Sequence, residues 1–288
     1  MPLRETRAES PLGSWTSTAW TPDAGDTACP VEQIWHFDGW MAHRRERVFP
    51  HGNLELIVHL GERYRDPSTG HTFPGLVMTG VATGALLVEA PLGRSHVMGV
   101  RFRPAGAFAV LGRPVHDLTN VSVDVAELAG RAAAELGERC RSAASARDCI
   151  GIALAFALER SRRIDPDPAV AWLCAQIVAD AGDVRLGDLV ERTGISATRL
   201  GARFRERVGV LPKRYARILR FRHALDLLAA GAASAPEAAF AAGYFDQAHF
   251  NAEFRAHAGM TPGTFLRAQR YPDSASLAED FFQDAATG

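Results

Sequence analysis

Hydrogen-bonding side chains on a short C-terminal stretch are the residues of this sequence best suited to chemistry. In GYFDQAHFNAEFRAHAGMTP, Ala248, Ala252 and Arg255 share one face of a helix at about 100° per residue, flanked by His249 and Asn251. Arginine can form paired hydrogen bonds with guanine, asparagine can do so with adenine, and an alanine methyl group can contact thymine. This combination favours a helix that lies in the major groove of DNA.

The same pattern occurs upstream, so one structural unit is used twice. GISATRLGARFRERVGVLPKRYAR superimposes on GYFDQAHFNAEFRAHAGMTPGTFLR, with Phe204 matching Phe254 and Pro212 matching Pro262 at an offset of 50 residues. Self-similarity at a fixed offset indicates a repeated supersecondary unit. The outward face of the first copy carries Thr198, Arg199, Ala202 and Arg205.

Each copy has the local signals of two helices joined by a tight turn. Gly194 and Gly243 can adopt the left-handed backbone conformation that ends a helix. Ser196 and Asp246 stand where an N-cap oxygen would begin the next helix. Apolar residues spaced i, i+4 should then bury one side of that second helix. These residues are Leu200 and Phe204 in the first copy and Phe250 and Phe254 in the second.

A basic helix predicted over 212–231 joins the two copies. It has a proline in its first turn and a glycine just past its end. A run of basic residues is usually a solvated face. Beside two helices that could enter DNA grooves, we expect some of these residues to contact phosphates. The residues predicted to bind phosphate are Ser196, Lys213, Arg214, Arg217 and Arg220.

The sequence before this repeat predicts a small antiparallel β sandwich or barrel followed by helices, so the chain is expected to be an α+β protein of two domains. Apolar runs punctuated by Gly and Pro predict strands at 54–60, 76–82, 85–90 and 96–102. Ala- and Leu-rich stretches predict helices at 105–112, 123–137 and 146–160. The predicted divisions are a loose segment at 1–30, a β domain at 31–160, a linker at 161–168, a helical DNA-binding domain at 169–271 and an acidic tail at 272–288.

Charge is distributed unevenly along the chain. The formal net charge is -1, but residues 183–270 carry 14 Lys and Arg against 8 Asp and Glu. This asymmetry predicts that only the C-terminal part meets a polyanion. The four cysteines are too sparse for a disulfide scaffold. Because no run of about 18 apolar residues occurs, we expect a soluble cytoplasmic protein with no membrane partner.

The C-terminal segment resembles the DNA-binding domain of the AraC/XylS family of bacterial transcription regulators. The resemblance covers roughly 183–270 and rests on the duplication together with the residues Pro236-Glu237-Ala238-Ala239, Gly243-Tyr244, Asp246-Gln247, His249-Phe250, Phe254 and Gly259-Met260-Thr261-Pro262. It implies two helix-turn-helix units joined by a long helix, double-stranded DNA as the partner and no cofactor. It places base-reading positions on Thr198, Gly201, Ala202, Gln247, Ala248, Asn251 and Ala252.

Several of these positions are glycine or alanine, which offer no side-chain hydrogen bond. Direct readout is therefore expected to rest on Thr198, Arg199, Arg205, Gln247, His249, Asn251 and Arg255, with methyl contacts and DNA shape contributing. The N-terminal half resembles the degenerate cupin-like sensor domain of such regulators. This implies a small-molecule effector, whose identity stays open. RNA polymerase is a further candidate partner. The helices after Pro104 are expected either to mediate homodimerisation or simply to cover the β core.

Two other function classes have partial signals in the sequence. A metal-dependent cupin enzyme needs histidines and a glutamate converging on one ion. The β region offers His36, His43, His51, His59, His71 and His96, but His51, Asn53 and Glu55 match the metal-binding pattern only in part. An alkyl-accepting DNA-repair protein needs an activated thiolate, and Cys29-Pro30 lacks the Cys-His-Arg context of such a site. We therefore expect no catalytic residue and no metal site.

Overall fold

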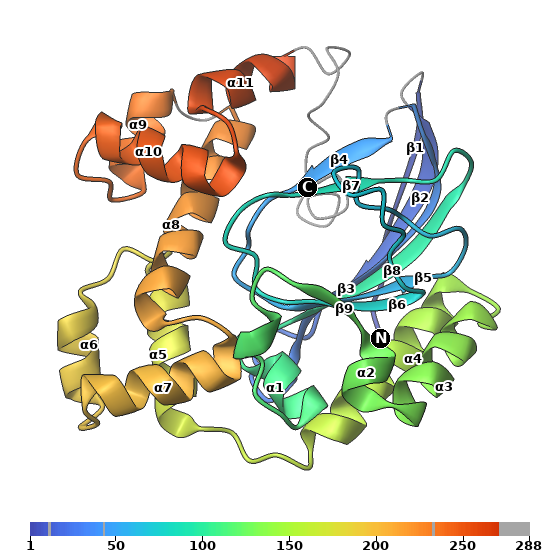
Figure 1. The fold of residues 1–288 in the computed structure, drawn as a ribbon, viewed down its shortest axis with the longest axis horizontal. Helices are drawn as coiled ribbons and strands as arrows, with labels where there is room; N and C mark the ends of the chain where they lie inside the picture. Colours follow the sequence, from blue (N-terminus) through green and yellow to red (C-terminus); the bar gives the residue numbers. More distant parts are fainter. Residues whose placement is uncertain (11–12, 43, 232–233, 271–288) are drawn as a thin grey trace.

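The computed structural model describes residues 1–10, 13–42, 44–231 and 234–270, and it has an antiparallel β part followed by a helical part (Figure 1). The two-domain α+β prediction is confirmed. The strands are β1 (Arg4–Ser10), β2 (Gly13–Trp20), β3 (Val31–Met41), β4 (Arg45–Val48), β5 (Glu55–His59), β6 (Leu76–Thr79), β7 (Leu86–Glu89), β8 (Ser95–Phe102) and β9 (Ser122–Asp124).

Within the described residues the strands form a seven-stranded sheet in the order β1-β2-β3-β8-β5-β6-β9 and a two-stranded sheet of β4 and β7. Alternating side chains give the larger sheet two apolar faces. Ile34 and Met98 point toward the main core, whereas Trp35 and Val97 point toward the smaller sheet. Gly99 pairs with Trp35, and a side chain there would overlap the indole ring.

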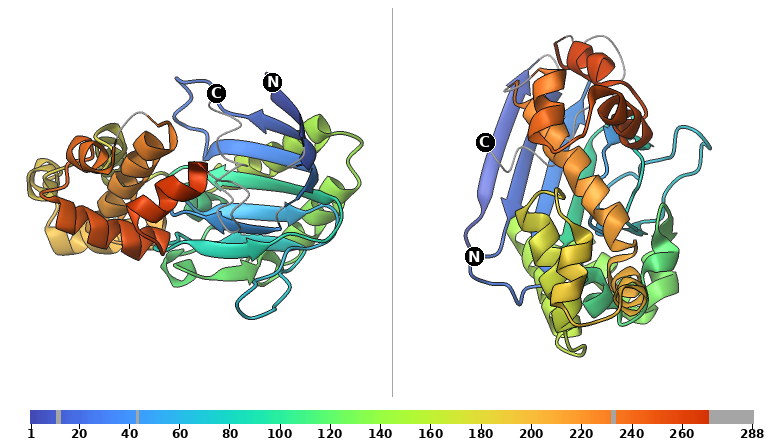
Figure 2. Two further views of the ribbon diagram at one scale, coloured as in Figure 1. Left: turned by 90° about the horizontal axis from the view of Figure 1, so that it is seen from above. Right: turned by 90° about the vertical axis from the view of Figure 1, so that its left-hand side faces the viewer.

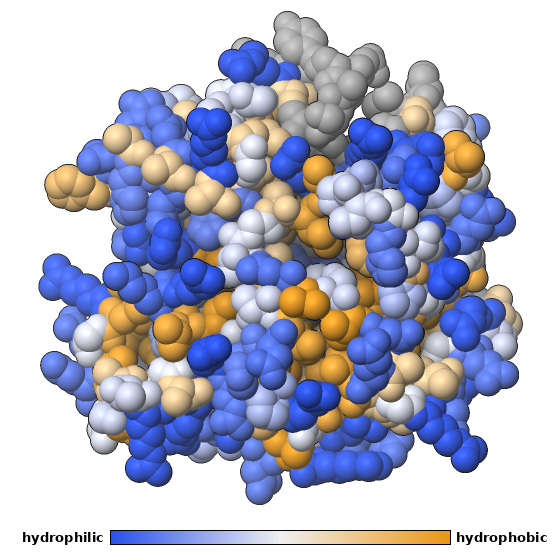
Figure 3. Space-filling model, in the orientation of Figure 1, coloured by the Kyte–Doolittle hydropathy of each residue, from blue (hydrophilic) through white to orange (hydrophobic). Residues whose placement is uncertain are grey.

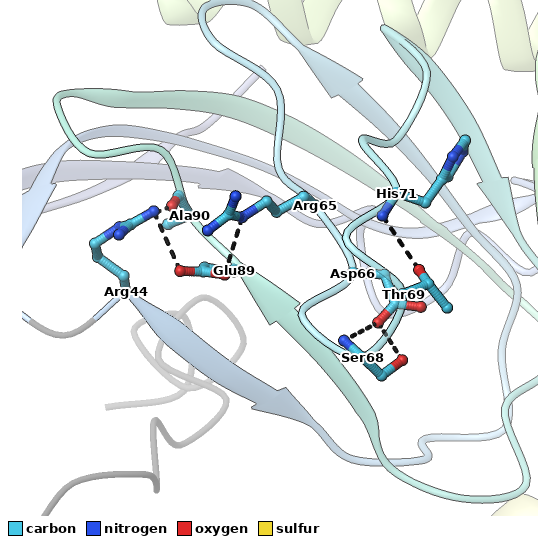
Figure 4. Close-up of polar contacts among 8 residues, drawn as sticks. All are labelled: Arg44, Arg65, Asp66, Ser68, Thr69, His71, Glu89 and Ala90. Atoms are coloured by element: carbon cyan, nitrogen blue, oxygen red, sulfur yellow. Dashed lines mark hydrogen bonds and ion pairs between the residues drawn. The ribbon is translucent and has the colours of Figure 1, made fainter.

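The small sheet is tied to the neighbouring loop by charged side chains. Figure 4 shows Arg44 and Arg65 both reaching Glu89 of β7, with nitrogen–oxygen distances of 3.2 and 2.9 Å. The hydrogen bond from Arg65 is the main cause that lowers the pKa of Glu89. These contacts hold β7 against the loop that follows β5, so the small sheet forms a fixed side of the β part.

The structure differs from the predicted loose segment at 1–30 where β1 and β2 lie. β1 pairs with β2, and β2 pairs with β3 from Gly13 opposite Met41 to Trp20 opposite Ile34. Composition rich in Ser and Thr suggested a loop. However, β-branched and aromatic residues suit a pleated, half-buried surface, and pairing with β3 supplies the backbone hydrogen bonds.

Helices cover one side of the larger sheet (Figures 1 and 2). They are α1 (Gly106–Leu111), α2 (Val125–Ala129), α3 (Arg131–Arg141) and α4 (Ala146–Ser161), with a 3-10 turn η1 (His116–Leu118). The single helix predicted over 123–137 is divided between α2 and α3. Gly130, at φ 54°, separates them, since a glycine adopts this backbone conformation without a steric penalty.

The helical part begins after the segment between Ser161 and Pro168, where the linker was predicted. Its helices are α5 (Pro168–Ala179), α6 (Leu186–Arg192), α7 (Ala197–Val208), α8 (Pro212–Ala229), α9 (Ala235–Ala241), α10 (Gln247–Ala258) and α11 (Pro262–Arg270). In Figure 1, α7 and α10 lie at opposite ends of α8. The predicted acidic tail at 272–288 lies outside the described residues.

The apolar core does not stop at the predicted linker. One buried cluster runs from Val31 and Phe102 of the β part through Val170 of α5 to Phe204 of α7 and Ile218 of α8. Residues of α5, α7 and the start of α8 therefore share one continuous apolar core with the β part. No helix among the described residues is both long and apolar enough to span a membrane.

Candidate nucleic-acid interface

The turns before the two repeated helices have the predicted glycine conformation, and one of the two predicted N-caps forms its hydrogen bond. Gly194 and Gly243 adopt φ angles of 66° and 72°, in the left-handed region. The Asp246 side chain accepts a hydrogen bond of 2.7 Å from the backbone N–H of His249, as an N-cap should. Ser196 occupies the same position before α7, but within the described part of the chain its hydroxyl makes no capping hydrogen bond.

The inner sides of α7 and α10 are fully buried, as the apolar spacing predicted. Leu200 and Phe204 are 0% exposed, as are Phe250 and Phe254. Phe254 makes edge-on ring contacts with Phe221 of α8 at 5.3 Å and with Phe265 of α11 at 5.9 Å. This packing fixes the rotation of each helix about its own axis, and so fixes which residues face outward.

The outward faces carry the residues predicted to read bases. Every one of them is exposed: Thr198, Arg199, Ala202 and Arg205 on α7, and Gln247, Ala248, His249, Asn251, Ala252 and Arg255 on α10. Gly201 is the exception among the positions that the resemblance implied. It is buried, and a side chain there would approach Leu211 at 3.6 Å, so it faces the protein instead of solvent.

The residues predicted to bind phosphate fall into two groups. Lys213 and Arg214 are exposed in the first turn of α8, and Ser196 is exposed before α7. In contrast, Arg217 is ion-paired with the buried carboxylate of Glu253 on α10 at 2.5 Å. Arg220 donates to the carbonyl of Gly182 at 3.2 Å, and it is only 19% exposed.

The phosphate prediction is therefore better supported for Lys213 and Arg214 than for Arg217 and Arg220. The cause is the position of each residue along α8, because other parts of the helical domain pack against the later two arginines. Spacing alone could not assign them, because their partners Glu253 and Gly182 come from other elements.

The β part holds the C-terminal end of each outward-facing helix through contacts that sequence reasoning missed. At α7, the backbone N–H of Val115 donates to the Glu206 carbonyl at 2.9 Å. The Thr119 hydroxyl donates to the Gly209 carbonyl at 2.8 Å. The acceptors of these bonds are backbone carbonyls, which every residue has, so no pattern of side chains in the sequence predicts them.

A matching set of contacts holds the end of α10. The N–H of Ala85 donates to the His257 carbonyl at 2.7 Å, and Arg47 donates to the Ala258 carbonyl at 3.1 Å. The His257 ring lies 2.7 Å from the Thr83 carbonyl through its Nδ1 atom. Burial is the main cause that lowers the pKa of His257, so the ring is held neutral here. We call these three contacts the α10 clamp.

A fourth contact beside the α10 clamp is apolar. Phe49, which follows β4 and is 2% exposed, packs against Phe265 at 5.8 Å and Phe221 at 6.4 Å between ring centroids. Both repeated units therefore touch the β part directly, the first through the main core and the second through Phe49 and the α10 clamp.

Asp167 fastens the start of α5 to α7. Its carboxylate caps α5 by accepting from the N–H groups of Ala169 and Val170, and it is ion-paired with Arg203 at 2.6 Å and Arg207 at 3.3 Å. Burial by itself would raise the pKa of Asp167, but the hydrogen bond from Arg203 and the other donors outweigh it and the pKa is lowered. The Asp167 carboxylate is therefore charged and can hold the two arginines of α7 by ion pairs.

A cavity of about 120 Å³ lies in the β part between the larger sheet and the β4–β7 sheet. Its wall is mainly apolar, with Trp35, Phe49, Ile57 and Tyr64 among the lining residues. Arg47, Phe49, Ala82 and Leu86 line the cavity and also belong to, or adjoin, the segments that contact α8, α10 and α11. The cavity and the α10 clamp therefore share one wall.

The described histidines of the β part do not gather into a group of three. Burial lowers the pKa of His51, and His59 contacts the Pro74 carbonyl through Nδ1 at 2.9 Å. Glu55 accepts a hydrogen bond from the Trp35 indole at 2.8 Å. His36 and His96 contact each other at 3.0 Å between their Nε2 atoms. Among the described residues no group of three or more His, Cys, Asp or Glu side chains could hold a metal ion, and His43 lies outside them.

The four cysteines are buried free thiols. Burial is the main cause that raises the pKa of Cys29, which disfavours the reactive thiolate. This environment gives no support to an alkyl-accepting role for Cys29.

Comparison with known families separates the chain into two matched segments. A family model described as a helix-turn-helix domain matches residues 189–268, which contain both repeated units and the helix between them. The C-terminal part of this chain is an AraC-type helix-turn-helix domain. A second model, described as a domain of unknown function (DUF6597), matches residues 28–124 of the β part. No curated protein matches the chain.

Solved structures similar to this chain include ToxT from Vibrio cholerae O395, with 11% identity, a TM-score of 0.43, and coverage of 79% of this chain and 97% of that one. An AraC-type DNA-binding regulator from Chromobacterium violaceum has 24% identity and a TM-score of 0.33, covering 36% of this chain and 95% of its own. The C-terminal domain of AraT from Geobacillus stearothermophilus has 20% identity and a TM-score of 0.34, covering 40% and 91%.

Proposed function

We propose that this protein is a transcription regulator that binds specific DNA sequences through α7 and α10. The observation that carries the proposal is the pair of helices, each with a buried aromatic side and an exposed face of donors, acceptors and methyl groups. Successive major grooves on one face of DNA lie about 34 Å apart. If α7 and α10 enter two such grooves, one molecule covers on the order of 20 base pairs.

Binding should combine base readout with phosphate contacts. Arg205 and Arg255 are the exposed guanidinium groups at equivalent positions of the two helices, and we assign them to base edges. Lys213 and Arg214 are assigned to phosphates, which fix the register of the protein without reading sequence. The excess of basic residues in the AraC-type domain supports a polyanionic partner.

The test is selection of bound fragments from genomic DNA by the full-length protein, followed by affinity measurements on the selected site. Arg205→Ala and Arg255→Ala should each weaken specific binding by about 1–3 kcal/mol. Arg131→Ala, an exposed arginine of α3 paired with Glu135, is the matched control and should leave affinity unchanged. Failure to enrich any sequence, or affinity that does not fall steeply with salt, would refute the proposal.

We further propose that a small molecule in the cavity of the β part modulates DNA binding. The shared wall with the α10 clamp supports this role, since an occupant that displaces Arg47 or Leu86 would change the support of α10. A ligand found by thermal-shift screening should change DNA affinity, and DNA should change ligand affinity by the same factor. A ligand bound in the cavity without any such coupling would contradict this role. Contact with RNA polymerase and pairing with a second copy stay predictions.

A further inference from the structure

Two phenylalanine side chains of the AraC-type domain project into solvent. Phe245 is 93% exposed and Phe240 is 86% exposed. Figure 3 shows apolar side chains among hydrophilic ones at the edge of the molecule formed by α9 and α10. Phe240 belongs to α9, whereas Phe245 stands directly before Asp246, the N-cap of α10. Exposing a phenyl ring to water is unfavourable, and neither ring is covered within the described residues.

The equivalent residue of the first unit shows that this exposure is not required by the motif. Ile195 precedes the N-cap of α7, and it is half-buried against the main core. A residue at this position commonly packs against the first buried turn of its helix. In the second unit Tyr244 takes the buried place instead, 5.1 Å from Phe250 and 6% exposed. The longer turn thus leaves Phe245 on the outside.

Phe245 is exposed at the N-terminal end of α10. Ala248 and Ala252 are exposed further along this helix and share one face of it. Gln247 and Asn251, also exposed, flank them. Apolar side chains are suited to the C5-methyl group of thymine, and asparagine and glutamine are suited to paired hydrogen bonds with adenine. Both kinds of group select A·T base pairs.

We infer that the second helix-turn-helix unit reads thymine methyl groups, with Phe245 as the principal apolar contact and Ala248 and Ala252 beside it. This inference rests on the proposed function and assigns a base class to one half of the binding site. DNA is the favoured occupant because the N-terminal residues of a recognition helix contact base edges. The positive charge of Arg255, which is exposed on the outward face of α10, agrees with this choice.

The test uses the full-length protein and the site selected from genomic DNA. Phe245→Ala is compared with Phe240→Ala, which removes a similarly exposed ring from α9 and is the matched control. Each thymine of the second half-site is replaced in turn by deoxyuridine, which removes only the methyl group. A lost methyl contact should weaken wild-type binding about fourfold. Phe245→Ala should weaken binding by at least as much, while Phe240→Ala should not.

The decisive result is the combination of the two changes. For at least one thymine, deoxyuridine should weaken wild-type binding and have no further effect on Phe245→Ala. Unchanged DNA affinity of Phe245→Ala would overturn the inference. Lower transcription in that case would point to a protein partner on this ring. Weakening that is the same for thymine and deoxyuridine would also overturn it. If the wild-type protein selects no sequence, the proposed function itself fails, which is a distinguishable outcome.

Discussion

Lys213 and Arg217 lie one turn apart on α8, yet the fold gives them different environments. Lys213 is exposed at the start of the helix, whereas Arg217 reaches back to the buried carboxylate of Glu253 on α10. Two basic residues on the same face of α8 therefore have different roles. One is exposed to solvent, and the other fastens α10 to the long helix behind it.

This difference predicts that alanine substitution affects DNA binding at Lys213 and stability at Arg217. Lys213→Ala should reduce the salt dependence of DNA binding by about one phosphate contact and leave stability unchanged. Arg217→Ala should lower the free energy of unfolding by about 1–2 kcal/mol, because Glu253 stays buried without its cation. This loss is smaller than for a fully buried ion pair, because Arg217 is itself partly exposed and solvent weakens the attraction. Urea unfolding and salt titrations measure the two effects.

A second substitution checks the reason given for Arg217. Adding Glu253→Gln removes the buried negative charge and should restore part of the stability lost in Arg217→Ala. If Arg217→Ala is as stable as wild type but binds DNA more weakly, Arg217 contacts phosphate after all.

Among the elements, α7 and α10 begin in the same way in sequence but differ in structure. Asp246 caps α10 through the N–H of His249, whereas Ser196 makes no capping hydrogen bond within the described residues. The free energy of a cap depends on that bond, because it satisfies a backbone donor that has no partner within the helix.

Alanine substitutions at the two N-caps should therefore be unequal. Asp246→Ala should lower the free energy of unfolding by about 1 kcal/mol, and Ser196→Ala should lower it by less than about half of that. Denaturant unfolding with a helix-sensitive signal is the measurement. Equal losses at both positions would show that Ser196 caps α7 in solution.

For the whole molecule, the α10 clamp connects the cavity side of the β part to the end of α10. His257 is its titratable member, and its ring faces Phe221 at 5.1 Å and the Thr83 carbonyl. Glu253, Arg217 and Arg214 are the charged groups that act on it. Because burial lowers its pKa in the folded protein, the proton binds more readily to the unfolded chain.

The sign of the pH effect follows from this difference. The contribution of the neutral ring is complete above the unfolded pKa of 6.5 and is lost as pH falls toward the lower pKa of the folded state. His257→Asn keeps a donor for Thr83 but does not titrate. The stability difference between wild type and His257→Asn should therefore shift against wild type between pH 7.5 and 5.5. An unchanged difference across that range would contradict a neutral buried ring.

The sequence by itself determined the local features of this protein. The repeat offset, the turn glycines, the cap positions and the buried aromatic pairs all follow from backbone preferences and helical periodicity over a few residues. Those signals placed α7, α8 and α10 and gave the outward faces of α7 and α10. They also predicted β5 to β8, where apolar runs were bounded by Gly and Pro.

Only the tertiary structure decided how these elements are held together. It paired β1 with β2 and β2 with β3, buried Gly201, and gave Arg217 and Arg220 partners from other elements. It also brought the β part against the carbonyl groups that end α7 and α10. Every residue carries a backbone carbonyl, so nothing in the side-chain pattern marks the ones that long-range packing selects.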